Sequence, residues 1–444
     1  MILGGVAITA AGNLLLRFLD FAVAVMLLRW LTIYEYGVYR LALAAHDFFS
    51  AFFLSGLENV VVSDAAASVE RDRRHARAIF TFYGVFLGCL GFLLWALFFF
   101  GSALLQWTGA GQEALFIISF LFLLSPIETA LKLRFQIFLD FGWAAFFKVL
   151  ADLTKIAAFT FFMYFSSFHT REALWSVIVT TAVPIVVTLL AYRRPALFGR
   201  VSYEDLRMAA AALFLHHGKW AIVSDAVNNA AQSIRPFIVK TFVGTEAVAL
   251  IAVAQNLLAA VKSLFPVREA LTPVLPRDAG DPAQLAQRIN RATKYATWAY
   301  GVLAVVSAVG VPLVVFLFFP KYMPALPVFY ILLLGLPFAG FRSVAVPVFY
   351  ALKAQRVLLL ITTSRTAILT VLNAMLTYFF GIWGAATEMV LIGIFTAPAY
   401  ARAIRVLLPN WRFRMRDLWT IDAYDRAFVK DLGSRIAKRM GLRI

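Results

Sequence analysis

The stretch "AGNLLLRFLDFAVAVMLLRW", residues 11–30, is a mostly apolar run that nevertheless contains Arg17 and Asp20. An α-helix needs about 20 such residues to cross the hydrocarbon core of a bilayer. Each charge costs at least about 2.5 kcal/mol at the centre of that core. Asn13, Arg17 and Asp20 are separated by four and three residues, so they share one face of a helix. The stretch therefore predicts a membrane-spanning helix whose polar face meets protein or water rather than lipid.

The rest of the chain repeats this pattern of long apolar runs and short polar breaks. Of its 444 residues, 62% are hydrophobic and 15% are charged, and the mean hydropathy is +0.81. A soluble chain carries about 25% charged residues. We therefore predict an all-α polytopic membrane protein with twelve transmembrane helices. The predicted spans are 4–28, 38–62, 79–101, 115–131, 143–165, 173–191, 218–239 (or from Met208), 247–265, 295–319, 325–351, 357–380 and 382–400.

The distribution of basic residues predicts the orientation of the chain. If both termini lie in the cytoplasm, 28 of the 41 Lys and Arg residues fall in cytoplasmic segments and five fall in segments on the opposite side. This bias follows the positive-inside rule. It also accounts for the net charge of +17 without a nucleic-acid partner. We expect a multi-pass membrane protein with both termini in the cytoplasm and an uncleaved first span.

Cysteine and histidine usage argues against a metal centre. The single cysteine, Cys89, lies within the third predicted span, so no disulfide framework or cysteine metal site is expected. His216 and His217 form the one histidine cluster but lack spaced partners, and a position at a helix entrance is the simpler interpretation. We expect neither a metal nor a cofactor.

Polar residues recur at helical spacing on several predicted spans. Lys148, Asp152 and Lys155 form one stripe on the fifth span. The other members are Asp225, Asn228, Asn229, Gln232 and Arg235 on the seventh span, Gln255, Asn256 and Lys262 on the eighth, Arg342 on the tenth, and Thr362, Arg365, Thr366 and Asn373 on the eleventh. Because lipid cannot satisfy these groups, the stripes should face one another or a shared water-filled cavity.

Two interpretations of the deep charges remain open at this stage. In the first, the charges form internal ion pairs, such as Arg17 with Asp20 or Asp47, and Lys155 with Asp152. In the second, they bind a transported ion. Arg235, Lys262, Arg342 and Arg365 have no acid three or four residues away on their own helices, and seven deep cations face five deep acids. An excess of fixed positive charge in low dielectric predicts a transported anion.

The chain also resembles two copies of one unit. "IYEYGVYRLALA" (33–44) opens the second span and "GTEAVALIAVA" (244–254) opens the eighth, and alignment of Glu35 with Glu246 gives an offset of 211 residues. Two six-helix bundles related by an axis along the membrane normal place a binding cavity between them. We predict an N-terminal lobe over 1–200, a C-terminal lobe over 201–407, and a basic cytoplasmic tail over 408–444 that is either a short interfacial helix or disordered.

Four segments resemble a known family. They are "LLRWLTIYEYGVYRLALA" (27–44), "FPKYMPALPVFYILLL" (319–334), "LKAQRVLLL" (352–360) and "LNAMLTYFFGIWGAATEMVL" (372–391). These are similar to the polysaccharide transporter, or O-antigen flippase (Wzx-like), family of the multidrug/oligosaccharidyl-lipid/polysaccharide (MOP) exporter superfamily. Asn373, Gly381 and Gly384 stand where the family's pattern uses them. The sequence departs from that pattern at Thr32–Ile33, where the family usually has Gly–Pro.

The resemblance implies a fold and a substrate. The fold would be two pseudo-symmetric six-helix lobes around a central cavity that opens alternately to each side of the membrane. The substrate would be an undecaprenyl-diphosphate-linked oligosaccharide, moved from the cytoplasmic to the periplasmic leaflet of the bacterial cytoplasmic (inner) membrane for polysaccharide biosynthesis. The expected partners are this lipid-linked glycan, membrane lipid, and the polymerase and chain-length regulator of the same pathway.

The chemistry of that substrate suggests roles for the deep polar residues. Guanidinium and ammonium groups suit a diphosphate, and amides suit sugar hydroxyls. The expected diphosphate-binding residues are Arg17, Lys155, Arg235, Lys262, Arg342 and Arg365. The expected sugar-contacting residues are Asn13, Asn228, Asn229, Gln232, Gln255 and Asn256. The candidates for ion coupling are Asp20, Asp47, Asp152 and Asp225, with a proton, Na⁺ and the membrane potential left open as driving force.

Other functions fit the sequence less well. A cation/drug antiporter of the same fold (MATE type) should have an anionic cavity, and a lipid II flippase typically has two further helices. A membrane enzyme, such as a polymerase, needs a large external loop or a catalytic cluster, and the sequence offers neither. We therefore expect a transporter rather than an enzyme.

Overall fold

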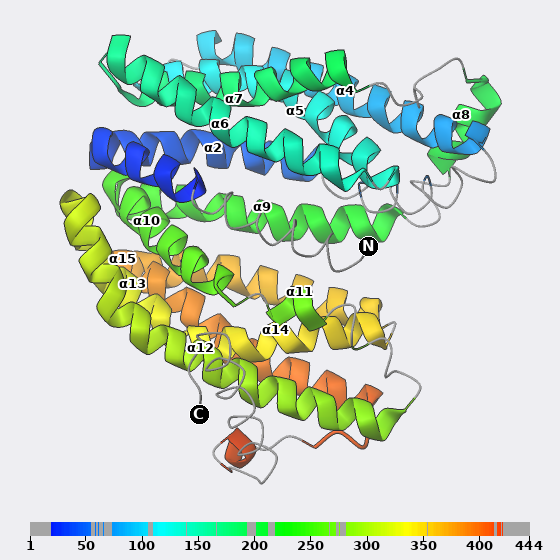
Figure 1. The fold of residues 1–444 in the computed structure, drawn as a ribbon, viewed down its shortest axis with the longest axis vertical. Coiled ribbons are helices and arrows are strands. Elements are labelled where there is room, and N and C mark those ends of the chain that lie inside the picture. The colour runs from blue at the N-terminus through cyan, green and yellow to red at the C-terminus, as the bar shows by residue number, and fades with distance from the viewer. Residues whose placement is uncertain are drawn as a thin grey trace, which may run out of the picture. The chain divides into compact units, whose positions relative to one another are not determined.

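The computed structural model describes residues 19–54, 58, 61, 65, 73–104, 110–138, 140–165, 167–192, 201–211, 218–265, 267–271, 275, 281–352, 354–412, 415–418 and 420, and within these ranges its regular structure is entirely helical (Figure 1). Residues 19–30 form a helix. The labelled helices are α2 (Ile33–Leu54), α4 (Arg73–Leu104), α5 (Ala110–Ile137), α6 (Phe141–Phe165), α7 (Thr170–Ala191), α8 (Tyr203–Ala211), α9 (Gly218–Phe242), α10 (Thr245–Ser263), α11 (Val267–Leu271), α12 (Pro282–Phe318), η3 (Pro320–Ala325), α13 (Leu326–Leu334), α14 (Leu336–Ala351), α15 (Gln355–Leu407) and η4 (Met415–Leu418).

The predicted spans correspond to these helices, and the all-α polytopic fold class is confirmed. One predicted boundary is wrong, because the fourth span, expected to be short, is the 28-residue helix α5. For the seventh span, Met208 lies in α8 and α9 begins at Gly218, and residues 212–217 between them lie outside the described residues. Six helices of the described chain are long and apolar enough to cross a membrane, and the bent pair 320–349 would make a seventh.

The long helix α15 contains two predicted spans. Its 53 residues would extend about 80 Å as one straight helix, far more than a bilayer requires. Gly381 interrupts it with φ 57° and ψ −137°, a conformation that only glycine adopts without strain. Asn373 and Glu388 lie 15 residues apart yet touch through their side chains, so the chain reverses direction at Gly381. This break falls where the sequence predicted the end of the eleventh span and the start of the twelfth.

The tenth predicted span is also broken. It consists of η3, α13 and α14, with a bend of 49° at Gly335 between the two α-helices. Apolar side chains alone gave no sign of this bend.

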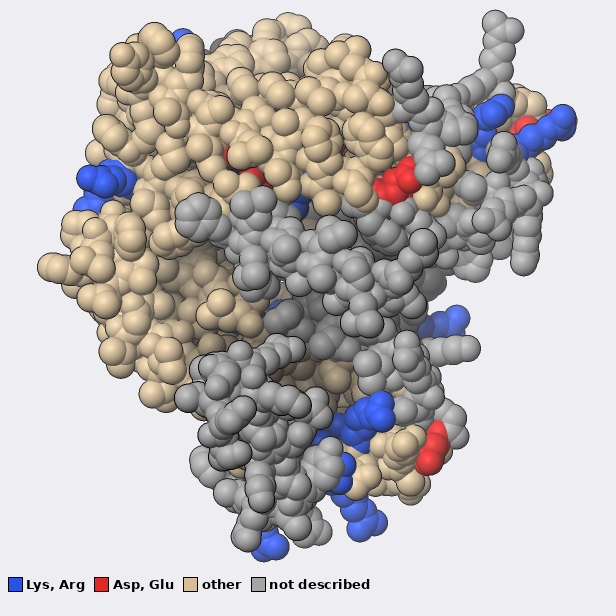
Figure 2. Space-filling model, viewed as in Figure 1, with Lys and Arg blue, Asp and Glu red and all other residues tan. Residues whose placement is uncertain are grey.

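The described surface of the helices is largely uncharged on the face drawn in Figure 2. Large apolar residues of α12 such as Val305 and Val309 are mostly exposed in the isolated chain, as expected of side chains that face lipid.

The chain divides into two compact units. The first comprises Met1–Ala260, Ser307–Leu334 and Leu359–Ile392. Within it α4 lies along α5, α6 along α7, and α2 along α9 (Figure 1). Its largest apolar cluster includes Tyr36, Ile118, Phe159 and Tyr322. Division of the chain into lobes 1–200 and 201–407 remains a prediction.

The second unit comprises Val261–Val306, Gly335–Leu358 and Gly393–Ile444. It includes the described start of the C-terminal tail, which packs against α12. The side chains of Asn290, Lys294 and Trp298 donate hydrogen bonds to the main-chain carbonyls of residues 412, 420 and 418. Trp411 is buried. This part of the tail is therefore held by α12, and the predicted interfacial helix over the later tail lies outside the described residues.

Candidate functional site

The first unit contains a buried carboxylate held by two helices. Glu388, on the second half of α15, is fully buried. Arg235 of α9 donates from Nη2 to Glu388 Oε1 at 3.2 Å. Asn373, on the first half of α15, donates from Nδ2 to Glu388 Oε2 at 3.2 Å. The chain reversal at Gly381 makes this arrangement possible, because it brings both halves of α15 to the same carboxylate.

A second guanidinium group lies near the same carboxylate. Arg365 is within electrostatic range of both Glu388 and Arg235. We call Arg235, Arg365, Asn373 and Glu388 the Glu388 cluster. The Nε atoms of both arginines are buried and have no hydrogen-bond partner among the described residues. The cluster therefore has one more guanidinium than carboxylate, together with unused N–H donors, and this combination suits an anion with several oxygens.

The sequence indicated part of this cluster. Spacing placed Arg235 and Arg365 on polar stripes, and neither has an acid three or four residues away on its own helix. The structure supplies a carboxylate for Arg235 from another helix, so for this residue an internal ion pair is present even though its own helix offers no acid. Glu388 was visible in the sequence as a deep acid, but spacing relates residues within one helix and cannot pair α9 with α15.

A second polar group surrounds Lys155 on α6. Its charge lies within electrostatic range of Asp152 on the same helix and of Asp20 on the helix over 19–30. The side chain of Lys155 is half-buried, that of Asp20 is exposed, and Lys148 is exposed. The polar faces of the first and fifth predicted spans thus meet. Arg17 and Asn13, on the first of these spans, lie outside the described residues.

The remaining predicted cations lie in the second unit. Lys262 at the end of α10 is half-buried, and it is within electrostatic range of Arg342 on α14, whose side chain is exposed. Two positive charges close to one another favour binding of a shared anionic ligand. The excess of positive charge in the Glu388 cluster has the same effect. The predicted diphosphate-binding residues therefore fall into three groups: Lys155, Arg235 with Arg365, and Lys262 with Arg342.

The predicted amide and ion-coupling residues are spread over several helices. Gln255 Nε2 lies 3.2 Å from Met389 Sδ, next to Glu388 in sequence, and Asn256 donates to Tyr36 Oη at 3.1 Å. Gln232 is exposed and Asn229 is half-buried. Asp47 is exposed, with Oδ1 3.4 Å from Nδ1 of His46. The side chains of Asp225 and Asn228 lie outside the described residues.

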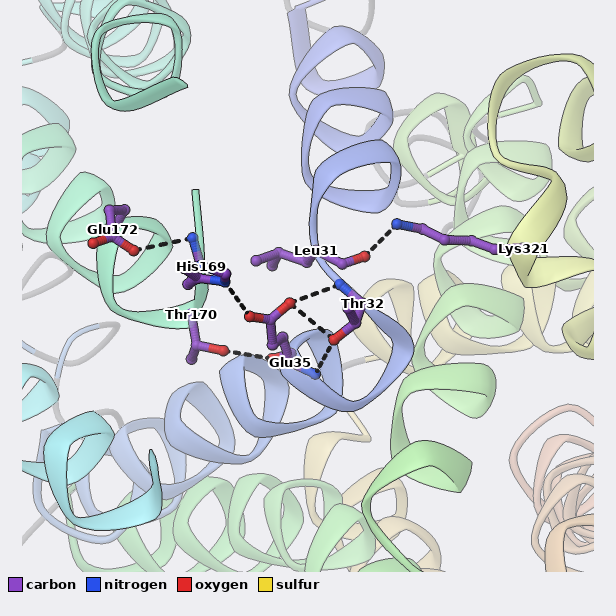
Figure 3. A network of polar contacts seen from close by, with 7 residues as sticks. All are labelled: Leu31, Thr32, Glu35, His169, Thr170, Glu172 and Lys321. Atoms are coloured by element: carbon purple, nitrogen blue, oxygen red, sulfur yellow. Dashed lines mark hydrogen bonds and ion pairs between the residues drawn. The ribbon is translucent and has the colours of Figure 1, made fainter. Parts of the chain in front are cut away.

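A polar network that sequence spacing only partly indicated joins three segments at the helix ends (Figure 3). Thr32 and Glu35 form a capping box at the start of α2: Thr32 N and Oγ1 donate to Glu35 Oε2 at 2.9 and 2.8 Å. His169 Nδ1 lies 2.6 Å from Glu35 Oε1, and Lys321 donates to the carbonyls of Leu31 and Arg29. With Thr170 and Glu172, these residues form what we call the Glu35 network.

The charges of the Glu35 network shift one another's ionisation. Burial raises the pKa of the Glu35 carboxyl, but the hydrogen bonds from Thr32 and His169 outweigh it and hold that pKa below its ordinary value of 4.5. Burial lowers the pKa of Lys321, and the nearby Glu35 charge partly offsets this. Lys321 is on η3, far along the chain, so one carboxylate and one ammonium link segments from both halves of the sequence.

The fold of broken helices described above is similar to that of solved membrane transporters. The chain is similar to a solved structure of the lipid II flippase MurJ in an inward closed conformation, with 12% identity over 93% of this chain and 89% of that chain and a TM-score of 0.72. A multidrug resistance MATE family transporter of the MOP superfamily in its inward-facing conformation gives 17% identity, 88% and 95% coverage, and a TM-score of 0.69. A MOP superfamily transporter from Pyrococcus furiosus is described as having a binding pocket of reverse polarity. It gives 14% identity over 92% of this chain and 94% of that chain, with a TM-score of 0.60.

The family follows from the sequence itself. A family model described as "Polysaccharide biosynthesis protein" matches residues 2–277, more than half of the chain. The chain belongs to this family. No curated protein matches it.

Proposed function

We propose that the protein is a flippase that moves an undecaprenyl-diphosphate-linked oligosaccharide from the cytoplasmic to the periplasmic leaflet. The observation that carries this proposal is the Glu388 cluster, in which Arg235 is paired with the one carboxylate and Arg365 lies within electrostatic range of both. A fixed positive surplus within a membrane protein of the polysaccharide biosynthesis family calls for an anionic substrate. The diphosphate is the part of a lipid-linked glycan that has this chemistry.

The proposed mechanism is alternating access. Arg365 and Arg235 bind phosphate oxygens, and the guanidinium fork gives two parallel hydrogen bonds to each group it meets. Amides such as Gln255 and Asn256 contact sugar hydroxyls, and the isoprenoid tail stays in the bilayer. Lys155 provides a further cation in the first unit, and Lys262 with Arg342 forms a separate cationic group in the second unit. Rocking of two helical bundles then exposes the substrate to the other leaflet.

The setting of this activity is part of the same proposal. The bias of Lys and Arg supports a cytoplasmic location of both termini. The proposed substrate belongs to the bacterial inner membrane. A polymerase and a chain-length regulator would take the product on the periplasmic side. The similar transporter from Pyrococcus furiosus, whose description names a pocket of reverse polarity, is a precedent for variation of charge within one fold. A cationic-drug antiporter is disfavoured here because its substrate would meet the arginines.

Arg365 is the residue to test, because it forms no side-chain hydrogen bond or ion pair among the described contacts. We expect Arg365→Ala to abolish complementation of a flippase-null strain while membrane abundance stays normal. Arg365→Lys should retain part of the activity, since it keeps the charge but loses the fork. Arg402→Ala, an exposed arginine on the same helix, is the matched control and should export normally. Full export by Arg365→Ala would refute binding of the diphosphate at this cluster.

A further inference from the structure

The Glu388 carboxylate occupies a position for which the flippase mechanism above has no role. It is fully buried, and both of its oxygens are engaged, one by Arg235 and one by Asn373. Burial of a carboxylate costs several kcal/mol unless charged and hydrogen-bonding partners compensate for it. A buried glutamate therefore calls for an explanation of what it does. Neutralisation of the arginines does not fully explain Glu388, because Arg235 and Arg365 carry two positive charges and Glu388 carries one negative charge.

The groups that face Glu388 limit what it can do. From α9 it is paired with Arg235, and from the first half of α15 it accepts a hydrogen bond from Asn373, while Arg365 lies within electrostatic range. The distance from Arg235 Nη2 to Glu388 Oε1 is 3.2 Å, longer than the 2.7–2.9 Å of a strong charge-assisted hydrogen bond. Arg235 Nε makes no hydrogen bond among the described residues. Arg235 is therefore held on one side only, and a second anion could compete for it.

We propose that Glu388 is an internal counter-ion that exchanges with the phosphate of the substrate. When no substrate is bound, Glu388 neutralises Arg235. A ligand with two phosphate groups displaces the carboxylate from Arg235 and is held by both arginines, while Asn373 keeps hold of Glu388. When the substrate leaves, the carboxylate takes Arg235 back and so drives release. This inference rests on the proposed function, because it assumes that an anion binds the two arginines.

Counter-ion exchange makes a prediction that a structural ion pair does not. If Glu388 competes with the substrate, its removal should tighten binding and slow release, so KM and kcat should both fall. If Glu388 only holds α9 to α15, its removal should weaken binding or lower the amount of folded protein. Glu388→Gln is nearly isosteric and leaves an oxygen to accept the hydrogen bond from Asn373, so it separates the two cases.

The experiment uses full-length protein. Binding of inorganic pyrophosphate is measured by calorimetry in detergent, and flipping of a fluorescent diphosphate-linked oligosaccharide lipid is measured in proteoliposomes. Glu388→Gln should bind pyrophosphate about tenfold tighter, the size expected when one competing charged hydrogen bond is lost, and its KM and kcat should both be lower. Glu128→Gln is the matched control. It removes the carboxylate of another pair, with Lys132 at 2.6 Å, and should change neither quantity.

A double variant keeps the test decisive if Glu388→Gln does not fold. Arg235→Gln/Glu388→Gln removes both members of the pair and leaves the net charge unchanged. It should bind pyrophosphate more weakly than the wild type, because one of the two arginines is gone. The exchange would be overturned if Arg235→Gln/Glu388→Gln bound pyrophosphate as tightly as the wild type. It would also be overturned if Glu388→Gln bound pyrophosphate no more tightly than the wild type.

Binding of pyrophosphate by the Arg365→Ala variant distinguishes failure of this inference from failure of the proposed function. If Arg365→Ala loses pyrophosphate binding while Glu388→Gln does not tighten it, the arginine site stands and the exchange fails. If Arg365→Ala binds as the wild type does, the site itself fails and the exchange fails with it.

Discussion

Single residues of the Glu388 cluster differ in how much the fold depends on them. The Arg235 side chain is 17% exposed and is hydrogen-bonded to a carboxylate that is fully buried. Arg365 lies nearby without a hydrogen bond to that carboxylate. Loss of one member of a buried ion pair leaves the other as an uncompensated charge, which is more costly than loss of an unbonded cation. The two arginines should therefore give different phenotypes when removed.

This difference can be measured as protein abundance and stability. We expect Arg235→Ala to lose about 3–5 kcal/mol of stability, because it removes the cation that is hydrogen-bonded to the buried Glu388 carboxylate. The variant should be scarce in membranes and should melt early in detergent. Arg235→Ala/Glu388→Ala should recover most of the loss, since neither charge remains. Normal abundance and melting of Arg235→Ala would mean that the pair contributes little to the fold.

Some of the site was predictable at this scale and some was not. Spacing on single helices identified Arg235, Arg365 and Asn373 as members of polar stripes. It could not join α9 to α15, because a partner on another helix depends on packing that no residue spacing encodes. The Glu35 capping box, by contrast, is a local four-residue motif, Thr32 to Glu35, that sequence alone can indicate.

Among the elements, the position of breaks within helices decides where the polar groups meet. The sequence predicted the break at Gly381 correctly, because a glycine separates two runs that are each long enough to span. It did not predict the bend at Gly335, since no polar residue marks that position and the run is apolar on both sides. Helix existence thus follows from apolar length, while helix shape depends on tertiary contacts.

The turn at Gly381 should be sensitive to any side chain. A Cβ at φ 57° and ψ −137° is strained, and we expect Gly381→Ala to cost roughly 1–3 kcal/mol. Because this turn also places Glu388 beside Asn373, substrate flipping should fall together with the melting temperature in detergent. Gly301→Ala is the matched control. Gly301 lies within α12 with open space around it, so the same change there should be neutral or slightly stabilising. Equal melting of the two variants would show that the turn is not under this constraint.

At the scale of the whole molecule, contacts between distant parts of the sequence hold the first unit together. Gly37 of α2 approaches the start of α10 so closely that a Cβ there would lie 2.3 Å from the carbonyl oxygen of Thr245. The Glu35 network adds polar contacts at the same end of α2, to His169 and, through the carbonyl of Leu31, to Lys321 (Figure 3). The pattern of basic residues predicts that this end faces the periplasm. Such contacts would have to break for that side to open during transport.

The contribution of the network should depend on pH in a defined direction. A carboxyl whose pKa is lowered on folding stabilises the folded state above its ordinary pKa of 4.5, and this stabilisation is lost as the pH falls through the lowered value. We therefore expect Glu35→Gln to cost about 1 kcal/mol near neutral pH, as loss of a helix cap does. The difference from the wild type should stay constant down to about pH 5 and vanish in more acidic solution. Melting in detergent between about pH 3 and 7 measures it.

The sequence supplies a control at the aligned position of its second half. Glu246 stands in the first turn of α10, 211 residues after Glu35, and its side chain is exposed. Both glutamates are near a helix N-terminus, so both lose the same favourable interaction with the helix dipole when they are replaced by Gln. Only Glu35 also has bonds to Thr32 and His169. Glu246→Gln should therefore destabilise less, and its effect should change less with acidity. If the two variants had equal cost and equal pH dependence, the lowered pKa of Glu35 would come from the helix dipole, and the network would not be what holds these segments together.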